Sequence, residues 1–204
     1  MITIVDYGLG NIAAFASVYN KANLEVSIAR TAEDLKNASK LILPGVGHFD
    51  HAMRLLQQSG MREALDEMVL GSKIPVIGVC VGMQMLARSS DEGELPGLGW
   101  IDADVRSFKS QEEMKQISVP HMGWNDVRPL SPSPLFSELD SGARFYFLHS
   151  YFMSCDRGED VLAICSYGFD FACAVQSSNI YGVQFHPEKS HRFGDRLLRN
   201  FAGL

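Results

Sequence analysis

The amino-acid sequence predicts an α/β fold, with an open, mostly parallel sheet that carries helices on both faces and an antiparallel β-rich excursion. Up to about residue 90, short apolar runs alternate with helical patterns, which is typical of parallel strands joined by helices. Past residue 90, short strand-like segments and turns replace the helical patterns. The 204 residues contain no internal repeat and no low-complexity tract, so we expect one domain over residues 1–204.

The first elements follow one another closely. Residues 2–6 are a predicted strand, residues 7–11 a tight turn and residues 12–21 a helix. A second strand is expected at 25–29. Thr31 and the acidic residues after it then suggest the capped start of a helix.

A third strand, at 41–43, is broken by the sequence Pro-Gly-Val-Gly at 44–47. Two helices are expected next, the first with Phe49, Met53 and Leu56 on one face and the second over 61–70. The apolar run at 74–79 predicts a buried strand. In a sheet of this kind, sites form at the carboxyl ends of the strands.

Cys80 follows that strand within Gly-Val-Cys-Val-Gly, and a helical pattern with Met83, Leu86 and Ala87 on one face continues from it. Glycines suit a sharp strand-to-helix turn, because side chains would collide with the backbone that folds past them. At a helix start, the dipole favours the thiolate. A lone cysteine is more often a small buried hydrophobic residue, but the flanking glycines favour a catalytic nucleophile.

The second half of the chain predicts mainly strands. Residues 91–99 are an expected loop, and residues 101–105, 143–148 and 161–167 are strand-like. A last strand is expected at 180–185, and a helix from about 190 to 202.

The last predicted strand ends in Gln-Phe-His-Pro-Glu at 184–188. Proline restrains His186 to extended geometry, so that His186 and Glu188 can point the same way. Glu188 could then hold one imidazole nitrogen while the other faces Cys80, as in a nucleophile-base-acid triad. A histidine before proline is more often an ordinary surface residue, but the position at the end of a strand in the same sheet favours the functional interpretation.

Two further regions are less specific. The Pro-Gly-Val-Gly turn could offer N–H groups to a developing oxyanion together with Val81, or it could be a simple turn. Aromatic, histidine and asparagine residues cluster at 120–125, expected as a loop, and at 145–151, and such clusters in loops suit docking or recognition. They could equally form a buried aromatic patch with satisfied polar tips.

Composition excludes several classes of function. The net charge of −6 and the pI of about 5.5 argue against binding to nucleic acid or to an anionic membrane. No apolar stretch approaches the roughly 20 residues that span a bilayer, and no basic segment precedes the apolar N-terminus. The four cysteines lack the paired spacing of a zinc site. We therefore expect a cytoplasmic protein.

The motifs at 78–84 and 182–190 resemble those of class I, triad-type glutamine amidotransferases. The segments 6–11, 43–47, 120–125 and 149–151 resemble one branch of that family, the glutaminase subunit of imidazole glycerol phosphate synthase. The resemblance covers essentially the whole chain. It implies a flavodoxin-like, three-layer fold and a role in histidine biosynthesis.

The resemblance implies a role for each matching position. Cys80 would attack the side-chain amide of L-glutamine, with His186 as acid and base and Glu188 orienting it. The oxyanion hole would come from Val81, Gly45 and Val46, and no metal or organic cofactor is implied. The residues expected to hold glutamine are Gly47, Gln84, His149, Ser150 and Tyr151.

The resemblance also implies a partner. Ammonia would pass to a cyclase subunit, a (β/α)8 barrel that forms a heterodimer with this chain and makes imidazole glycerol phosphate and an aminoimidazole carboxamide ribotide. The residues expected to face that subunit are Asn11, Pro120, His121, Met122, Gly123, Trp124, Asn125 and Tyr146.

The sequence departs from the family pattern at Val81, where leucine is usual, at 12–15 and at 191–194. At 12–15 the sequence reads Ile-Ala-Ala-Phe, where the family usually carries an arginine or a serine. The ending at 191–194 and the stretch at 87–92 also resemble paralogues that supply ammonia for amidation of a surface-polysaccharide amino sugar, which is the first alternative. A non-catalytic scaffold of the same fold is the second, and intact triad positions argue against it. Cysteine peptidases of similar architecture are a more distant alternative.

Overall fold

The computed structural model describes residues 1–114, 116–140 and 142–204. Its strands are β1 Ile2–Val5, β2 Val26–Ala29, β3 Lys40–Gly45, β4 Val76–Cys80, β5 Ser89–Ser90, β6 Ala103–Ser107, β7 His121–Asp126, β8 Arg128–Pro129, β9 Arg144–His149, β10 Tyr151–Cys155, β11 Val161–Tyr167, β12 Phe169–Ser177 and β13 Ile180–Val183. Its longer helices are α1 Ile12–Lys21, α2 Phe49–Gln58, α3 Arg62–Asp66 and α5 His191–Gly203. Its short helical segments are η1 Glu33–Leu35, η2 Glu67–Gly71, α4 Val81–Gln84, η3 Phe108–Ser110, η4 Glu112–Met114, η5 Pro134–Phe136, η6 Gly158–Asp160 and η7 Pro187–Lys189.

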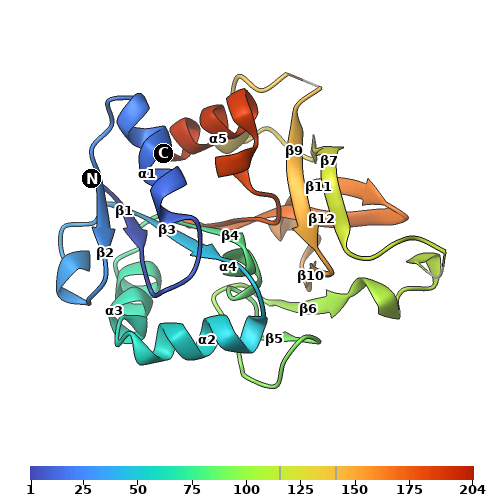
Figure 1. The fold of residues 1–204 in the computed structure, drawn as a ribbon, viewed down its shortest axis with the longest axis horizontal. Helices are drawn as coiled ribbons and strands as arrows, with labels where there is room; N and C mark the ends of the chain where they lie inside the picture. Colours follow the sequence, from blue (N-terminus) through green and yellow to red (C-terminus); the bar gives the residue numbers. More distant parts are fainter. Residues whose placement is uncertain (115, 141) are drawn as a thin grey trace.

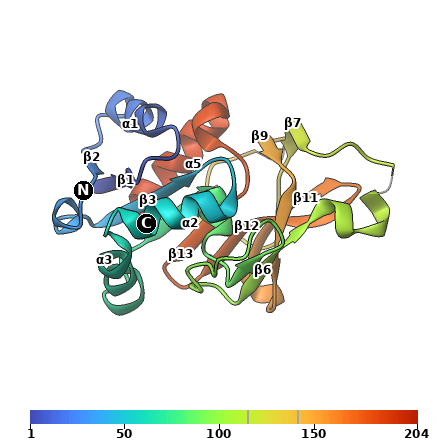
Figure 2. The same ribbon diagram turned by 60° about the horizontal axis from the view of Figure 1, so that its bottom comes forward.

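In the described part of the chain, eleven strands form one sheet with the order β2-β1-β3-β4-β13-β12-β10-β6-β5, and β11 and β8 extend it beside β12. Pairing is parallel from β2 to β13 and mostly antiparallel beyond. The strands β7 and β9 form a separate antiparallel pair. Figures 1 and 2 show the longer helices toward one end of the molecule and the antiparallel strands at the other. The predicted α/β fold, with its antiparallel excursion, is confirmed.

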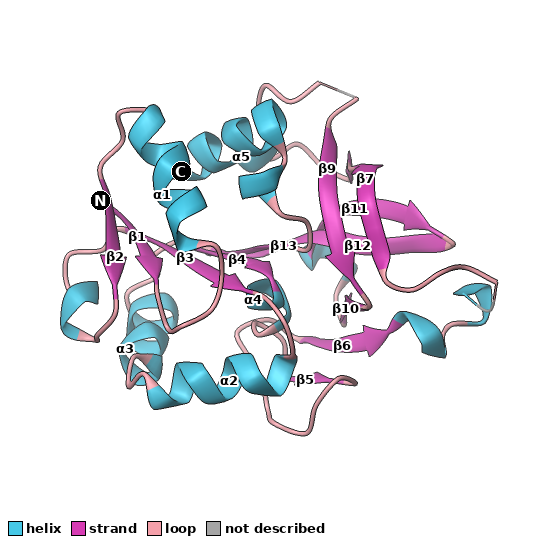
Figure 3. Cartoon of the chain, viewed as in Figure 1, coloured by secondary structure: helices cyan, strands magenta, loops and turns pink. Residues whose placement is uncertain are grey.

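Helices cover both faces of the parallel part (Figure 3). The helices α1 and α5 lie together on one face, and α2 and α3 lie on the other. Every residue of β4 is buried, which explains why its sequence is an unbroken apolar run rather than an alternating one. In the described residues, no helix is long and apolar enough to cross a membrane.

Several predicted elements differ from the structure. The segment at 120–125, expected as a loop, is largely strand β7. The helix expected after Thr31 is only the short turn η1. The helix expected after Cys80 ends after one turn, at Gln84. The strand β10 has no counterpart among the predicted segments.

Candidate active site

Three parallel strands bring the predicted site together at their carboxyl ends. In the sheet, β4 lies between β3 and β13. Gly45, the last residue of β3, is paired with Cys80, and Val79 is paired with Val183. The chain after each of these strands therefore begins at the same edge of the sheet.

Cys80 occupies a sharp turn between β4 and α4. Its backbone has φ +56° and ψ −115°, a conformation that a side chain adopts only under strain, and the residue is only 4% exposed. A Cβ atom at Gly82 would lie 2.0 Å from the carbonyl oxygen of Leu43, and one at Gly45 would lie 2.3 Å from the nitrogen of Gly82. The glycines are therefore needed where β3 and the turn approach each other.

His186 and Glu188 form a buried pair beside this turn. Nδ1 of His186 lies 3.0 Å from Oε1 of Glu188, and the two side chains are 4% and 2% exposed. His186 has φ −100° and ψ 93°, so its predicted extended geometry is confirmed, but Pro187–Lys189 is the turn η7 and Glu188 does not continue the extended backbone. The backbone is also held, because Ser190 Oγ donates to the carbonyl oxygen of His186 at 2.6 Å.

The charge state of His186 follows from its neighbours. Burial acts most strongly and lowers the pKa of the imidazole, but Cys80 and Glu188 both favour the protonated form and raise the pKa to about 9. Both neighbours therefore favour the imidazolium form of His186. It can stabilise a thiolate on Cys80 and can later donate that proton.

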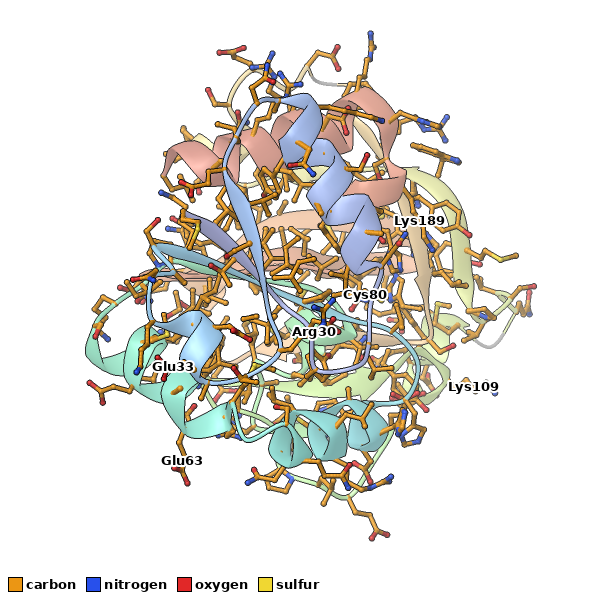
Figure 4. All side chains as sticks on the ribbon, turned by 60° about the vertical axis from the view of Figure 1, so that its left-hand side comes forward. Arg30, Glu33, Glu63, Cys80, Lys109 and Lys189 are labelled. Atoms are coloured by element: carbon orange, nitrogen blue, oxygen red, sulfur yellow. The ribbon has the colours of Figure 1, made fainter. Side chains whose placement is uncertain are left out.

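A pocket of about 470 Å³ opens over these side chains. The residues that line it are Val46, Gly47, Cys80, Val81, Gln84, Glu92, Pro120, Leu148, His149, Ser150, Tyr151, His186 and Lys189. Two of these residues, Cys80 and Lys189, are labelled in Figure 4. All five residues predicted to hold substrate line this pocket, whereas Gly45 and Glu188 do not.

Gln184 is a site residue that sequence reasoning missed. It is fully buried, its Nε2 lies 3.8 Å from the Sγ of Cys80, and its Oε1 accepts a hydrogen bond from Gln84 Nε2 at 3.0 Å. A polar residue in an apolar strand end, two positions before His186, is the signal that could have found it. Glu92 and Lys189 were also missed, since they lie in a loop and a turn.

The predicted partner-facing residues divide between surface and interior. Met122 and Trp124 point outward from β7 and are 65% and 39% exposed, and Leu148 on β9 is 40% exposed. His121 is buried, so its side chain does not face a partner directly. Asn125 also turns inward, where it donates to the carbonyl oxygen of Ser166.

The remaining predicted interface residues lie around this surface. Asn11 is exposed at the start of α1, and Pro120 lines the pocket. Tyr146 packs edge-on against Trp124, and Lys189 Nζ lies 5.9 Å from the centre of the Tyr146 ring. His191 stacks on Trp124 at 5.1 Å and 6°. Within the described ranges, no three His, Cys, Asp or Glu side chains are grouped to hold a metal.

The family model of class I glutamine amidotransferases matches residues 3–203. The sheet and its strand-end cysteine site are therefore those of a protein of this class. A solved glutamine amidotransferase superposes with a TM-score of 0.76 at 21% identity, covering 100% of this chain and 99% of that one, which supports the fold. Imidazole glycerol phosphate synthase subunit HisH of Bdellovibrio bacteriovorus is 58% identical, and that of Leptospira interrogans is 50% identical, each over 100% of both chains. The chain belongs to the class I glutamine amidotransferase family and, within it, to the HisH glutaminase subunits of imidazole glycerol phosphate synthase in histidine biosynthesis.

Proposed function

We propose that the chain splits L-glutamine into L-glutamate and ammonia with Cys80, His186 and Glu188, and that it passes the ammonia to a cyclase subunit. The observation that carries this proposal is the meeting of Cys80 and the His186–Glu188 pair at one pocket. The residues come from the ends of two neighbouring strands, which suits a site assembled by the sheet itself.

The chemistry follows from the protonated imidazole. The Sγ atom of Cys80 attacks the side-chain amide carbon of glutamine. His186 donates its proton to the leaving nitrogen, which departs as ammonia and leaves a glutamyl thioester on Cys80. The neutral imidazole then takes a proton from water, whose oxygen attacks the thioester and releases glutamate. Glu188 orients the ring throughout through Nδ1.

The oxyanion formed at each attack needs N–H donors. Main-chain N–H groups of Val81 and of the Gly45–Val46 region are the proposed donors. Support comes from the position of Val46 and Val81 in the pocket wall and from the pairing of Gly45 with Cys80.

Glutamine itself would occupy the same pocket. Gly47 and Gln84 line it on the side of the catalytic turn, and His149, Ser150 and Tyr151 line it where β9 leads into β10. The Nε2 atom of Gln84 lies 3.4 Å from the carbonyl oxygen of Tyr151, so the two walls are joined.

The cyclase subunit, a (β/α)8 barrel in the proposed heterodimer, would bind the surface beside the pocket. Met122, Trp124 and Leu148 expose apolar side chains there, and aromatic residues are common anchors of such interfaces. Asn11 and Tyr146 belong to the same proposed surface, and Gly123 contributes only backbone to it, between the outward Met122 and Trp124. Pro120 and Leu148 also line the pocket, so ammonia formed at Cys80 would leave toward the partner.

A variant pair tests the catalytic part. Cys80→Ala should abolish glutamate release in the presence of the cyclase, whereas Cys155→Ala, which changes a half-buried cysteine outside the pocket, should retain it. Unchanged hydrolysis by Cys80→Ala would overturn the mechanism. The histidine-pathway role is tested by growth without histidine of a strain that lacks its own glutaminase subunit. Failure of the wild-type chain there would favour the polysaccharide paralogue.

A further inference from the structure

Two buried histidines outside the triad, His121 and His149, face each other beneath the pocket wall. They are directly paired across the antiparallel strands β7 and β9. Nδ1 of His121 lies 2.9 Å from Nε2 of His149. The proposed mechanism gives neither imidazole a part in bond making, although His149 and Pro120, the residue before His121, both line the pocket.

The pocket end of this pair fixes one proton. Nδ1 of His149 lies 2.7 Å from the carbonyl oxygen of Tyr151. A carbonyl oxygen only accepts, so Nδ1 of His149 carries the hydrogen. If His149 is neutral, its Nε2 is an acceptor, and Nδ1 of His121 must be the donor between the two rings.

The contacts of Asn125 with His121 indicate the same direction of hydrogen bonding, independently of His149. The Nδ2 atom of Asn125 lies 3.0 Å from the carbonyl oxygen of Ser166, which also only accepts, and 3.4 Å from Nε2 of His121. The amide therefore turns its two donor hydrogens toward these atoms, and Nε2 of His121 accepts. A second proton on either ring would set two donors against each other at one contact of the chain.

The surroundings keep both rings neutral and in place. His121 is stacked between Phe147 and Tyr167, with ring centres at 4.7 Å and 4.1 Å, and His149 packs against Phe108 and Phe171. Burial lowers the pKa of His121 to about 4 and that of His149 to about 3. The result is a one-way series of hydrogen bonds from Asn125 through His121 and His149 to the Tyr151 carbonyl.

We propose that His121 and His149 are positioning residues of the glutamine site, which hold the Ser150–Tyr151 wall in register with strand β7 through this series. The proposal rests on the proposed function, because it assigns glutamine to the pocket that Ser150 and Tyr151 line. It also gives β7 two roles, since Met122 and Trp124 point from the same strand to the proposed partner surface. Displacement of β7 by a partner would therefore reach the substrate wall through His121.

Imidazole ¹⁵N shifts of the full chain at pH 7 test the geometry without any activity measurement. The expected result is that His121 and His149 are both neutral and both carry their hydrogen on Nδ1. A hydrogen on Nε2 of either ring, or titration of either ring between pH 6 and 7, would overturn the series. Failure here and failure of the glutaminase mechanism are thus separate observations.

Kinetics with the cyclase present test the positioning role. His121→Phe keeps an aromatic ring but leaves Nε2 of His149 without its donor, so we expect KM for glutamine to rise about tenfold with kcat changed by less than about threefold. His121→Gln can again donate and should recover part of the loss. Phe147→Leu removes a stacking partner and keeps the hydrogen bonds, so KM should change by less than about twofold. An equal rise for Phe147→Leu, or no rise for His121→Phe, would contradict the proposal.

Discussion

The Nδ1 atom of His186 lies 3.0 Å from Oε1 of Glu188, although the turn η7, not an extended strand, carries the glutamate. Both side chains are almost completely buried. Little water therefore screens the carboxylate from the imidazole, so Glu188 strongly favours the protonated form of His186.

Removing that carboxylate charge should impair catalysis strongly. In Glu188→Gln the amide keeps the approximate shape but no longer favours the imidazolium, so kcat with the cyclase should fall by about 10²-fold or more. The measurement is glutamate release across pH 6–9. Arg128→Gln, which changes an exposed ion pair with Asp170 outside the pocket, is the control. A loss of less than about threefold for Glu188→Gln would exclude an essential role for the pair.

Gln184 should support the reactive sulfur of Cys80. Its Nε2 lies 3.8 Å from Sγ, and its buried amide is anchored by Gln84. In Gln184→Leu the sulfur loses this donor, so alkylation of Cys80 by iodoacetamide at pH 7 should slow by about threefold to tenfold. Gln176→Leu alters a less buried amide on β12 and should leave the rate unchanged. Equal rates for all three proteins would contradict the assignment.

Close packing at the turn should make Gly82 intolerant of any side chain. A Cβ there would lie 2.0 Å from the carbonyl oxygen of Leu43, so Gly82→Ala should lower the free energy of unfolding by about 3 kcal/mol or prevent folding. A Cβ at Gly158 meets no atom within 4 Å, and Gly158→Ala is the matched control. Urea denaturation compares the two variants. Equal stability would contradict the observed approach of β3 to the turn.

Acid should destabilise the protein through the buried histidines. The pKa values of His121 and His149, about 4 and about 3, lie below the value near 6.5 expected in an unfolded chain. Between these values the unfolded state binds more protons, so stability falls as pH decreases from about 6.5 toward 4. Each histidine adds a slope of up to about 1.4 kcal/mol per pH unit. Urea denaturation at pH 4.5–6.5 measures how the free energy of unfolding changes with pH. His121→Phe should lower that slope by the contribution of one histidine, and an unchanged slope would contradict this.

Trp124 should anchor the cyclase subunit. It is held edge-on by Tyr146 and stacked by His191, and a large rigid side chain of this kind commonly dominates an interface. Trp124→Ala should therefore raise the Kd for the cyclase at least about tenfold. Leu70→Ala changes an exposed apolar residue in η2, on the helical end of the molecule, and serves as the control. Equal affinities would move the interface elsewhere.

Much of the site could be predicted from local sequence. The glycines around Cys80 reflect collisions between backbone segments, and such collisions leave a visible pattern in the chain. The spacing of His186 and Glu188 around proline predicts their pairing; His186 is extended as expected, and a tight turn rather than a continued strand then brings Glu188 to the ring. The roles of these residues remain predictions.

Strand β7 could not be recognised in the same way. Its inward positions hold His121, Gly123 and Asn125, while Met122 and Trp124 point outward, which reverses the usual alternation of apolar and polar residues. The inward polar groups depend on hydrogen bonds to distant residues such as His149 and Ser166. No local pattern contains those contacts, and the same holds for the link from Gln184 to Gln84.

Glutamate release from glutamine, measured for the purified chain alone and then with a histidine-pathway cyclase subunit and its nucleotide ligand, tests the central claim most directly. The proposed function predicts slow release alone and strong stimulation by the liganded cyclase, with stimulation lost in Cys80→Ala. Equal release with and without the cyclase would contradict it.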